Sequence, residues 1–235
     1  MTFTSLQLVM TSSTQTLTSG TSSGLMTVQL QDASGNPVNA ASALTVGLSS
    51  SSSHGLFRNS GDTSTITSVV IASGSNSASF KYKDTSAGTP TVTAASSGVT
   101  SATQVETVTA GSASQLSITS VAQNTTANVA SGNITVQIQD AQGNPVNAPA
   151  GGTSVTLSSN TSGTATFTPS TLVIAAGSNS GTFTYKDTKA GTPTITVSAQ
   201  GLSSDTQQET VTAGVAAQLS ITSVAQNTTA NVASG

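Results

Sequence analysis

Carboxylates that recur beside predicted turns are the residues of this chain best suited to chemistry. One aspartate precedes each of two Gly-Asn-Pro turns, and another opens each of two Thr-x-Ala-Gly turns. Carboxylate oxygens are ligands that Ca²⁺ prefers, which makes four residues candidate calcium ligands: Asp32, Asp84, Asp140 and Asp187. No run of alternating acidic residues accompanies them. We therefore expect each aspartate to cap its own turn by accepting backbone N–H groups, and we expect no cofactor. Calcium binding is the alternative hypothesis.

The residue types that could serve in catalysis are too few to suggest an enzyme. The chain has one histidine, His54, and no cysteine. Its acidic residues mostly occupy equivalent positions in two repeats, which is typical of structural residues. We expect no catalytic residue, and we expect His54 to be a solvated loop residue.

A lysine–asparagine crosslink is a further possibility, because one lysine and one glutamate recur in each repeat. The lysines are Lys83 and Lys186, and the glutamates are Glu106 and Glu209. Such a bond needs a buried lysine. The lysines alternate with aromatic residues along their strands, so we expect them to face solvent and to stay uncrosslinked.

Four asparagines lie in N-x-Ser/Thr sequences and are candidate glycosylation sites: Asn124, Asn133, Asn160 and Asn227. The aromatic residues are interpreted differently. Phe80, Tyr82, Phe183 and Tyr185 alternate with polar residues, so we expect them in the core and not on a ligand-binding platform.

Composition excludes several classes of partner. Charged residues make up 6% of the 235 residues, and the five basic ones form no stripe, so nucleic-acid binding has no electrostatic basis. No stretch approaches the ~20 apolar residues of a membrane span, and the first residues do not resemble a signal peptide. We expect an extracellular protein whose export signal lies outside this chain.

Repetition sets the domain organisation. Residues 110–132 return as residues 213–235 with only two differences, at a spacing of 103 residues. Tandem repeats of this length are the size of one small domain. We predict a first domain over residues 1–110, a second over residues 111–213 and the opening strand of a third over residues 214–235, with short junctions that restrict bending.

Within each repeat, short segments of alternating apolar and polar residues are separated by turn residues. Met26, Val28 and Leu30 face one way while Thr27 and Gln29 face the other, which is typical of a strand with one buried face. Seven to nine such segments per repeat, with no helical period, predict an all-β fold of tandem β-sandwiches. The first repeat is longer around residues 51–64, where we expect a longer surface loop.

The run TVQLQDASGNPVNA and its copy TVQIQDAQGNPVNA resemble the opening strands of bacterial and archaeal immunoglobulin-like repeats. The runs IASGSNSASFKYKDTSAGTPTVTA and IAAGSNSGTFTYKDTKAGTPTITVSA resemble their closing strands. Such repeats occur in large surface proteins, including invasin- and intimin-type adhesins and surface layers. The resemblance implies immunoglobulin-like sandwiches in an elongated rod that serves as a spacer or presenting stalk.

The first functional hypothesis is therefore a non-enzymatic structural module of an extracellular surface protein, a stalk of an adhesin or surface layer. Its partners would be neighbouring repeats or identical subunits, with a cell-surface receptor or glycan as a further possibility. A second hypothesis is a self-assembling filament or surface-layer subunit that donates its C-terminal strand through Leu219, Ile221 and Val224. A third is an immunoglobulin-like structural protein of a phage or virion.

Overall fold

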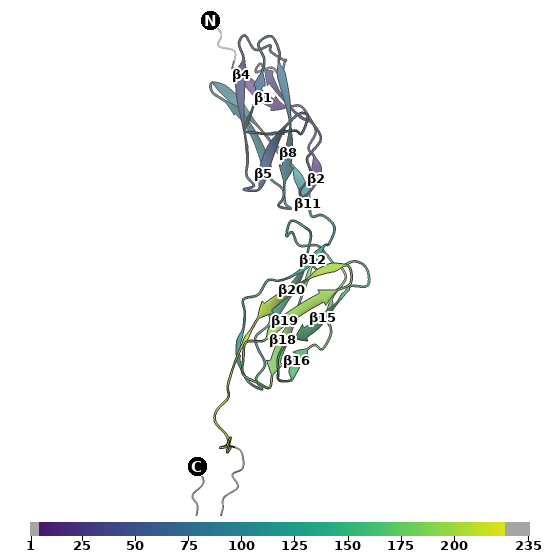
Figure 1. Ribbon diagram of the computed structural model, residues 1–235. Helices are drawn as coiled ribbons and strands as arrows, with labels where there is room; N and C mark the ends of the chain where they lie inside the picture. The colour runs from purple at the N-terminus through teal and green to yellow at the C-terminus, as the bar shows by residue number, and fades with distance from the viewer. Residues whose placement is uncertain (1–4, 224–235) are drawn as a thin grey trace, which may run out of the picture.

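The computed structural model describes residues 5–223, and this part of the chain contains strands and turns but no helix. Two β-sandwiches follow one another end to end (Figure 1). We call residues 5–109 module 1, residues 110–114 the spacer and residues 115–212 module 2. In the described part, no helix is long and apolar enough to cross a membrane.

Module 1 consists of two layers joined through its first strand. β1 pairs antiparallel with β3 on one side and parallel with β10 on the other. The strand order is β6-β5-β8-β3-β1-β10-β9-β4-β7, and a separate pair joins β2 to β11 in parallel. The strands are β1 (Gln7–Met10), β2 (Thr16–Thr18), β3 (Met26–Gln31), β4 (Leu44–Ser50), β5 (Gly55–Asn59), β6 (Thr65–Ile66), β7 (Ser68–Ile71), β8 (Ser77–Asp84), β9 (Thr91–Ser96), β10 (Val99–Val105) and β11 (Thr107–Thr109).

Module 2 repeats this arrangement with one strand fewer. Its order is β16-β18-β14-β12-β20-β19-β15-β17, again with a separate parallel pair, β13 and β21. The strands are β12 (Gln115–Ile118), β13 (Asn124–Thr126), β14 (Ile134–Gln139), β15 (Thr153–Ser159), β16 (Ala165–Thr168), β17 (Leu172–Ile174), β18 (Ser180–Asp187), β19 (Thr194–Ala199), β20 (Leu202–Gln208) and β21 (Thr210–Thr212).

This topology is that of an immunoglobulin-like sandwich. In each module the first and last strands are interrupted, and each continues in the parallel pair. When each interrupted strand is counted once, module 1 has nine strands and module 2 has eight. The prediction of tandem immunoglobulin-like sandwiches with seven to nine strands is confirmed.

Each module has its own apolar core, built by the predicted alternation. In module 1, Met26, Val28 and Leu30 are buried while the residues between them are only partly buried. The aromatic residues lie in the cores, as expected: Phe80, Tyr82, Phe183 and Tyr185 are at most 1% exposed. A third ring packs against each pair, Phe57 in module 1 and Phe167 in module 2, with centroids 5.4–5.8 Å apart.

The extra residues of module 1 lie at the surface within residues 51–64, where a longer loop is expected, and the structure shows that they form a hairpin. Phe57 pairs with Tyr82 as Phe167 pairs with Tyr185, which places the insertion after Phe57. There β5 turns into β6, and Arg58 binds Asp62 across the turn at 2.9 Å. Hydrogen bonds within the turn hold these residues as ordered structure.

Candidate functional site at the module junction

The turn after β14 carries the side chains that join the two modules. Asp140 begins this turn and Asn144 ends it. The Asp140 carboxylate accepts the N–H groups of Gln142 and Asn144 through Oδ1, both at 2.8 Å, and the Asn144 amide through Oδ2 at 2.9 Å. Gly143 has φ of 86°, a backbone conformation that favours glycine. The local sequence Asp-Ala-Gln-Gly-Asn therefore fixes both side chains before any contact with module 1 is counted.

The same two side chains then reach module 1. Oδ2 of Asp140 accepts the hydroxyl of Ser19 at 2.6 Å. Oδ1 of Asn144 accepts the N–H of Ala87 at 2.8 Å, and its amide donates to the Thr85 carbonyl at 2.9 Å. Ser19 follows β2 and the other two residues lie in the turn after β8. Two loops of module 1 are thus bound by one turn of module 2.

The spacer also contacts this turn. The Gly111 N–H donates to Oδ2 of Asp140 at 2.8 Å. A methyl group added to Gly111 would lie 3.4 Å from that oxygen, and one added to Gly20 would lie 3.3 Å from the Gln142 side chain. The contact beside Gly111 is an ordinary one, so it does not require glycine, whereas Gly20 has φ of 77°, a backbone conformation that favours glycine.

The burial of Asp140 and Asn144 and the charge of the Asp140 carboxylate agree with a stable contact between the modules. Asp140 is 1% exposed and Asn144 is 7% exposed. Burial alone would raise the pKa of the Asp140 carboxyl, but hydrogen bonds from Ser19, Asn144 and Gly111 outweigh it and hold that pKa well below its ordinary value. The junction therefore contains a charged carboxylate whose oxygens are fully used by hydrogen bonds.

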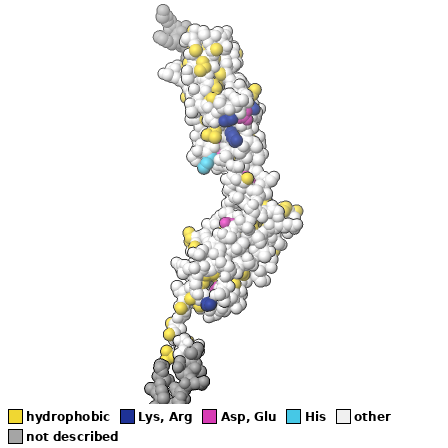
Figure 2. All heavy atoms as spheres, viewed as in Figure 1, with side chains coloured by type: hydrophobic (Ala, Val, Ile, Leu, Met, Phe, Trp, Pro, Cys, Tyr) yellow, Lys and Arg dark blue, Asp and Glu magenta, His cyan; other side chains and the backbone are white. Residues whose placement is uncertain are grey.

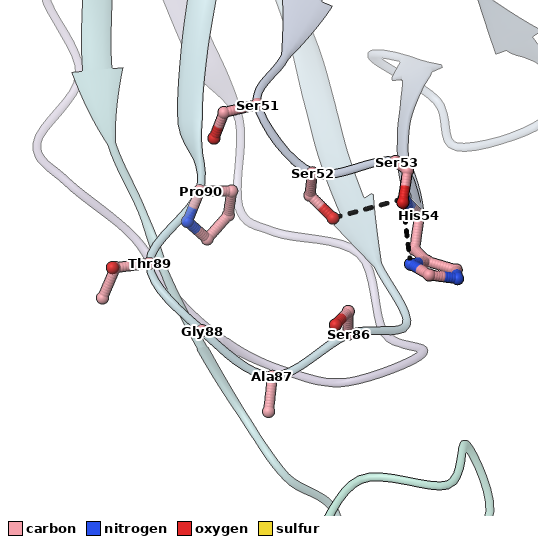
Figure 3. A pocket seen from close by; sticks show the side chains of 9 residues that line it. All are labelled: Ser51, Ser52, Ser53, His54, Ser86, Ala87, Gly88, Thr89 and Pro90. Atoms are coloured by element: carbon pink, nitrogen blue, oxygen red, sulfur yellow. Dashed lines mark hydrogen bonds between the residues drawn. The ribbon is translucent and has the colours of Figure 1, made fainter.

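Hollows lined by hydroxyl groups lie beside the junction. One of about 400 Å³ lies between the turn before β5 and the turn after β8 (Figure 3). A smaller one, of about 170 Å³, runs from His54 to the Asn144 turn. His54 lines both and is exposed, with its Nδ1 3.3 Å from the Ser53 hydroxyl. No carboxylate lines either hollow, so neither offers His54 an acid–base partner.

The aspartates that open the Thr-x-Ala-Gly turns are buried in their own modules. Asp84 accepts the Tyr82 hydroxyl at 2.5 Å and the Ser86 N–H at 2.9 Å. Asp187 makes the same bonds with the Tyr185 hydroxyl and the Lys189 N–H. Burial, and then the neighbouring Asp187, raises the pKa of Tyr185 to about 12. Each aspartate caps its turn and satisfies a buried phenol.

Asp32, the remaining calcium candidate, occupies the equivalent turn at the other end of module 1. Its carboxylate accepts the N–H groups of Ser34 and Asn36, both at 2.9 Å. Across residues 5–223, no three His, Cys, Asp or Glu side chains come together in a way that could hold a metal ion.

The two recurring glutamates are buried where the last strand of each module is interrupted. Glu106 is 0% and Glu209 is 1% exposed. Oε2 of each accepts a backbone N–H from the segment between the first two strands, from Gln15 and Gln123 respectively, while Oε1 has no partner among the described residues. Burial outweighs these hydrogen bonds and raises the pKa of both carboxyls.

Lys83 and Lys186 are half-buried, and the one ion pair of the described chain is Arg58–Asp62.

Of the glycosylation candidates, three are exposed: Asn124 at the start of β13, Asn133 before β14 and Asn160 after β15. Oδ1 of Asn160 accepts the Thr194 N–H at 2.7 Å.

Of the strand-donation candidates, Leu219 and Ile221 are at least 90% exposed. Val224 and Asn227 lie outside the described residues.

Sequence reasoning missed the contacts of Asp140 and Asn144 with module 1. Ser19 is 121 residues from Asp140, and no local pattern connects them. One available signal was the short spacer, which forces the turn after β14 and the loops of module 1 into proximity.

The surface around the junction carries few charges, and most of the visible face is neither charged nor apolar (Figure 2). This agrees with the composition of the chain.

Comparison with known proteins gives structural neighbours but no sequence family. No family model matches the chain, and no curated protein matches it. It is similar to the adhesin InvE of Yersinia pseudotuberculosis, at 16% identity and a TM-score of 0.36, over 88% of this chain and 58% of that one. It is also similar to domains 4 and 5 of the S-layer protein SbsC, at 18% identity and a TM-score of 0.34, over 88% and 97%. A third is invasin, a bacterial integrin-binding protein, at 16% identity and a TM-score of 0.35, over 88% and 39%.

Proposed function

We propose that this chain is a non-enzymatic spacer that holds immunoglobulin-like modules in a fixed end-to-end orientation within an extracellular surface protein. The observation that carries the proposal is the pair of side chains, Asp140 and Asn144, that bind two loops of module 1 across the junction. An extended stalk needs each junction to resist bending, and these bonds supply that resistance.

The energy of the junction is sufficient for this role. Each intramolecular hydrogen bond contributes about 1 kcal/mol net, so the three bonds between the modules favour the docked orientation on the order of 100-fold. The spacer already holds the partners close together, so docking does not carry the entropy cost of bringing two free molecules together. A few well-placed bonds are therefore enough.

The location at a cell surface is part of the proposal. It is supported by the resemblance of the TVQLQDASGNPVNA and TVQIQDAQGNPVNA runs to repeats of surface adhesins and surface layers. The hydroxyl-rich, weakly charged surface suits packing against neighbouring repeats or a carbohydrate layer.

Residual dipolar couplings of the whole chain in a weakly aligning medium test the spacer role. If the junction is rigid, one alignment tensor fits the amides of module 1 and module 2 together. Two tensors of clearly different magnitude would show independent motion and would contradict the proposal.

A second candidate function, assembly by strand donation, is favoured by the segment after module 2. Residues 218–221 repeat the sequence of β12, and Leu219 and Ile221 are exposed where their counterparts Leu116 and Ile118 pack in module 2. The same sequence offered by another chain could pair as β12 does. Sedimentation of the chain with and without residues 215–235 tests this, and an unchanged assembly state would exclude it.

A further inference from the structure

A second copy of the junction turn lies at the opposite end of module 1. The sequence Asp-Ala-Ser-Gly-Asn-Pro over residues 32–37 matches Asp-Ala-Gln-Gly-Asn-Pro over residues 140–145. Both turns follow the strand that pairs with the first strand of their module. The last residues of β3 and β14 each make an isolated bridge to the proline that follows the turn.

The two turns have the same internal geometry. The N–H of Asp32 bonds to the Asn36 carbonyl at 2.9 Å, as Asp140 does with Asn144. Oδ2 of Asp32 accepts the Asn36 amide at 3.0 Å, against 2.9 Å in module 2. Gly35 has φ of 85°, within one degree of its counterpart Gly143. The turn of module 1 therefore holds the binding conformation without a bound neighbour in the described chain.

The contacts made outward differ between the two turns. Asn144 is buried, and its Oδ1 accepts the Ala87 N–H. Asn36 is exposed, and among residues 5–223 its Oδ1 has no hydrogen-bond donor. Within that range, Oδ2 of Asp32 accepts a hydrogen bond only from the Asn36 amide. Oδ2 of Asp140 accepts one from the Asn144 amide and also one each from the Ser19 hydroxyl and the Gly111 N–H.

We propose that the Asp32–Asn36 turn is an open docking site for the loop end of another module of the module 1 type. This inference rests on the proposed spacer function. The partner needs a serine hydroxyl after its second strand and a turn that offers a backbone carbonyl and a backbone N–H, as Ser19, Thr85 and Ala87 do at the natural junction. Because the turn is already in its binding conformation, docking does not require it to reorganise.

The groups that the partner must supply also predict which type of module end the open turn binds better. At the corresponding end of module 2, Ala127 stands where module 1 has Ser19, so the hydroxyl that binds the carboxylate is missing. Asn128 and Lys189 stand where module 1 has Gly20 and Ser86, and both are bulkier. The open turn should therefore accept an end of the module 1 type better than an end of the module 2 type.

A three-module chain tests the proposal. Residues 5–114 are joined directly to residues 7–223, so that Gln7 takes the place of Gln115 and the new junction keeps the natural spacer. The chain has no cysteine, so nitroxide labels can be attached at Ser101→Cys in both copies of module 1. Pulsed electron–electron resonance then reports the distance distribution across the new junction. The two-module chain labelled at Ser101→Cys and Ser204→Cys, two exposed and equivalent strand positions, gives the reference.

We expect the new junction to give one narrow distribution, within about twofold of the reference width. Asp32→Ala with Asn36→Ala in the second copy should broaden it by at least about twofold. The same pair in the first copy, where the turn faces no module, is the matched control. It should fold and leave the width unchanged.

A broad new junction beside a narrow natural one would overturn the docking site and leave the spacer function intact. So would a narrow junction that the second-copy substitutions do not affect. If both junctions are broad, the spacer function itself is wrong. A chain that begins with residues 111–212 followed by the spacer, residues 110–114, in place of the added module 1 tests the preference, and the proposal expects its new junction to be the broader one.

Discussion

The two Asp-x-x-Gly-Asn turns of this protein have nearly the same sequence and the same internal hydrogen bonds, yet only one joins modules in the described chain. The turn of module 1 is partly exposed, and its carboxylate stabilises the turn itself. In the turn of module 2, Asp140 and Asn144 are buried, and their side chains also bind two loops of module 1. The difference lies in what faces each turn.

This comparison shows how a local motif acquires a second role. Capping fixes the positions of the carboxylate and the amide, and it leaves one oxygen of each able to accept a further bond. When a short spacer brings a neighbouring module close, those oxygens receive donors from it. A repeat protein can thus build its junctions from residues that each module already needs for its own turn.

The largest expected effect follows from Asp140→Ala. It leaves the Ser19 hydroxyl and the Gly111 N–H without their acceptor and removes the cap of the turn. A loss of about 2–4 kcal/mol in the stability of module 2 is expected. In calorimetry its transition should fall by more than about 8 °C.

Asp32→Ala is the matched control, because it removes the same cap with no neighbouring module in the described chain. It should lower the stability of module 1 by clearly less. Equal losses from the two substitutions would mean that the junction contributes nothing beyond turn capping.

Asn144→Ala comes next in size. The substitution removes both bonds to the Thr85–Ala87 turn, and a loss of about 1–3 kcal/mol is expected. Amide hydrogen exchange of Ala87 should accelerate, since its N–H loses its acceptor. Asn36→Ala should leave exchange at Ala87 unchanged, and any acceleration there would count against the assigned contact.

Ser19→Ala should cost about 1.5 kcal/mol, the low end of the range for a hydrogen bond to a charged group, because the carboxylate keeps its other donors. It should also raise the pKa of Asp140 toward the ordinary value, because a donor that favours the charged form is lost. NMR titration of the Asp140 carboxyl measures this shift. An unchanged pKa would show that the Ser19 hydroxyl does not bind it.

The smallest effect concerns the buried glutamates. Because burial raises the pKa of Glu209 above its ordinary value, the folded chain holds the proton more tightly than the unfolded chain. Its contribution to stability is full below the unfolded pKa of about 4.5 and is lost as the pH rises through the folded pKa. Glu209→Gln should remove this dependence and be at least as stable near neutral pH. Melting curves between about pH 4 and pH 7 test this, and a variant with an unchanged slope would contradict it.

The contribution of Asp140 has the opposite sign. Its pKa is lowered in the folded chain, so its stabilisation is present above the unfolded value of 3.8 and is lost as the pH falls toward the folded pKa.

Local sequence was enough to predict the sandwiches and the capping role of the aspartates. The alternation of Met26, Val28 and Leu30 with polar residues specifies a buried face, and Asp-x-x-Gly-Asn specifies a capped turn. These features depend on residues a few positions apart.

The junction could not be predicted in the same way. The bond between Ser19 and Asp140 depends on how two folded modules meet. The hairpin after Phe57 likewise depends on β5 continuing beside β8, where the Ser/Thr-rich sequence suggested only a loop.

The most direct test of the account is the distance distribution between nitroxides at Ser101→Cys and Ser204→Cys in the two-module chain. The account predicts one narrow distribution, unchanged by Asp32→Ala with Asn36→Ala and strongly broadened by Asp140→Ala with Asn144→Ala. A broad distribution in the parent chain, or one that the substitutions in module 2 leave narrow, would contradict the claim that this turn holds the modules together.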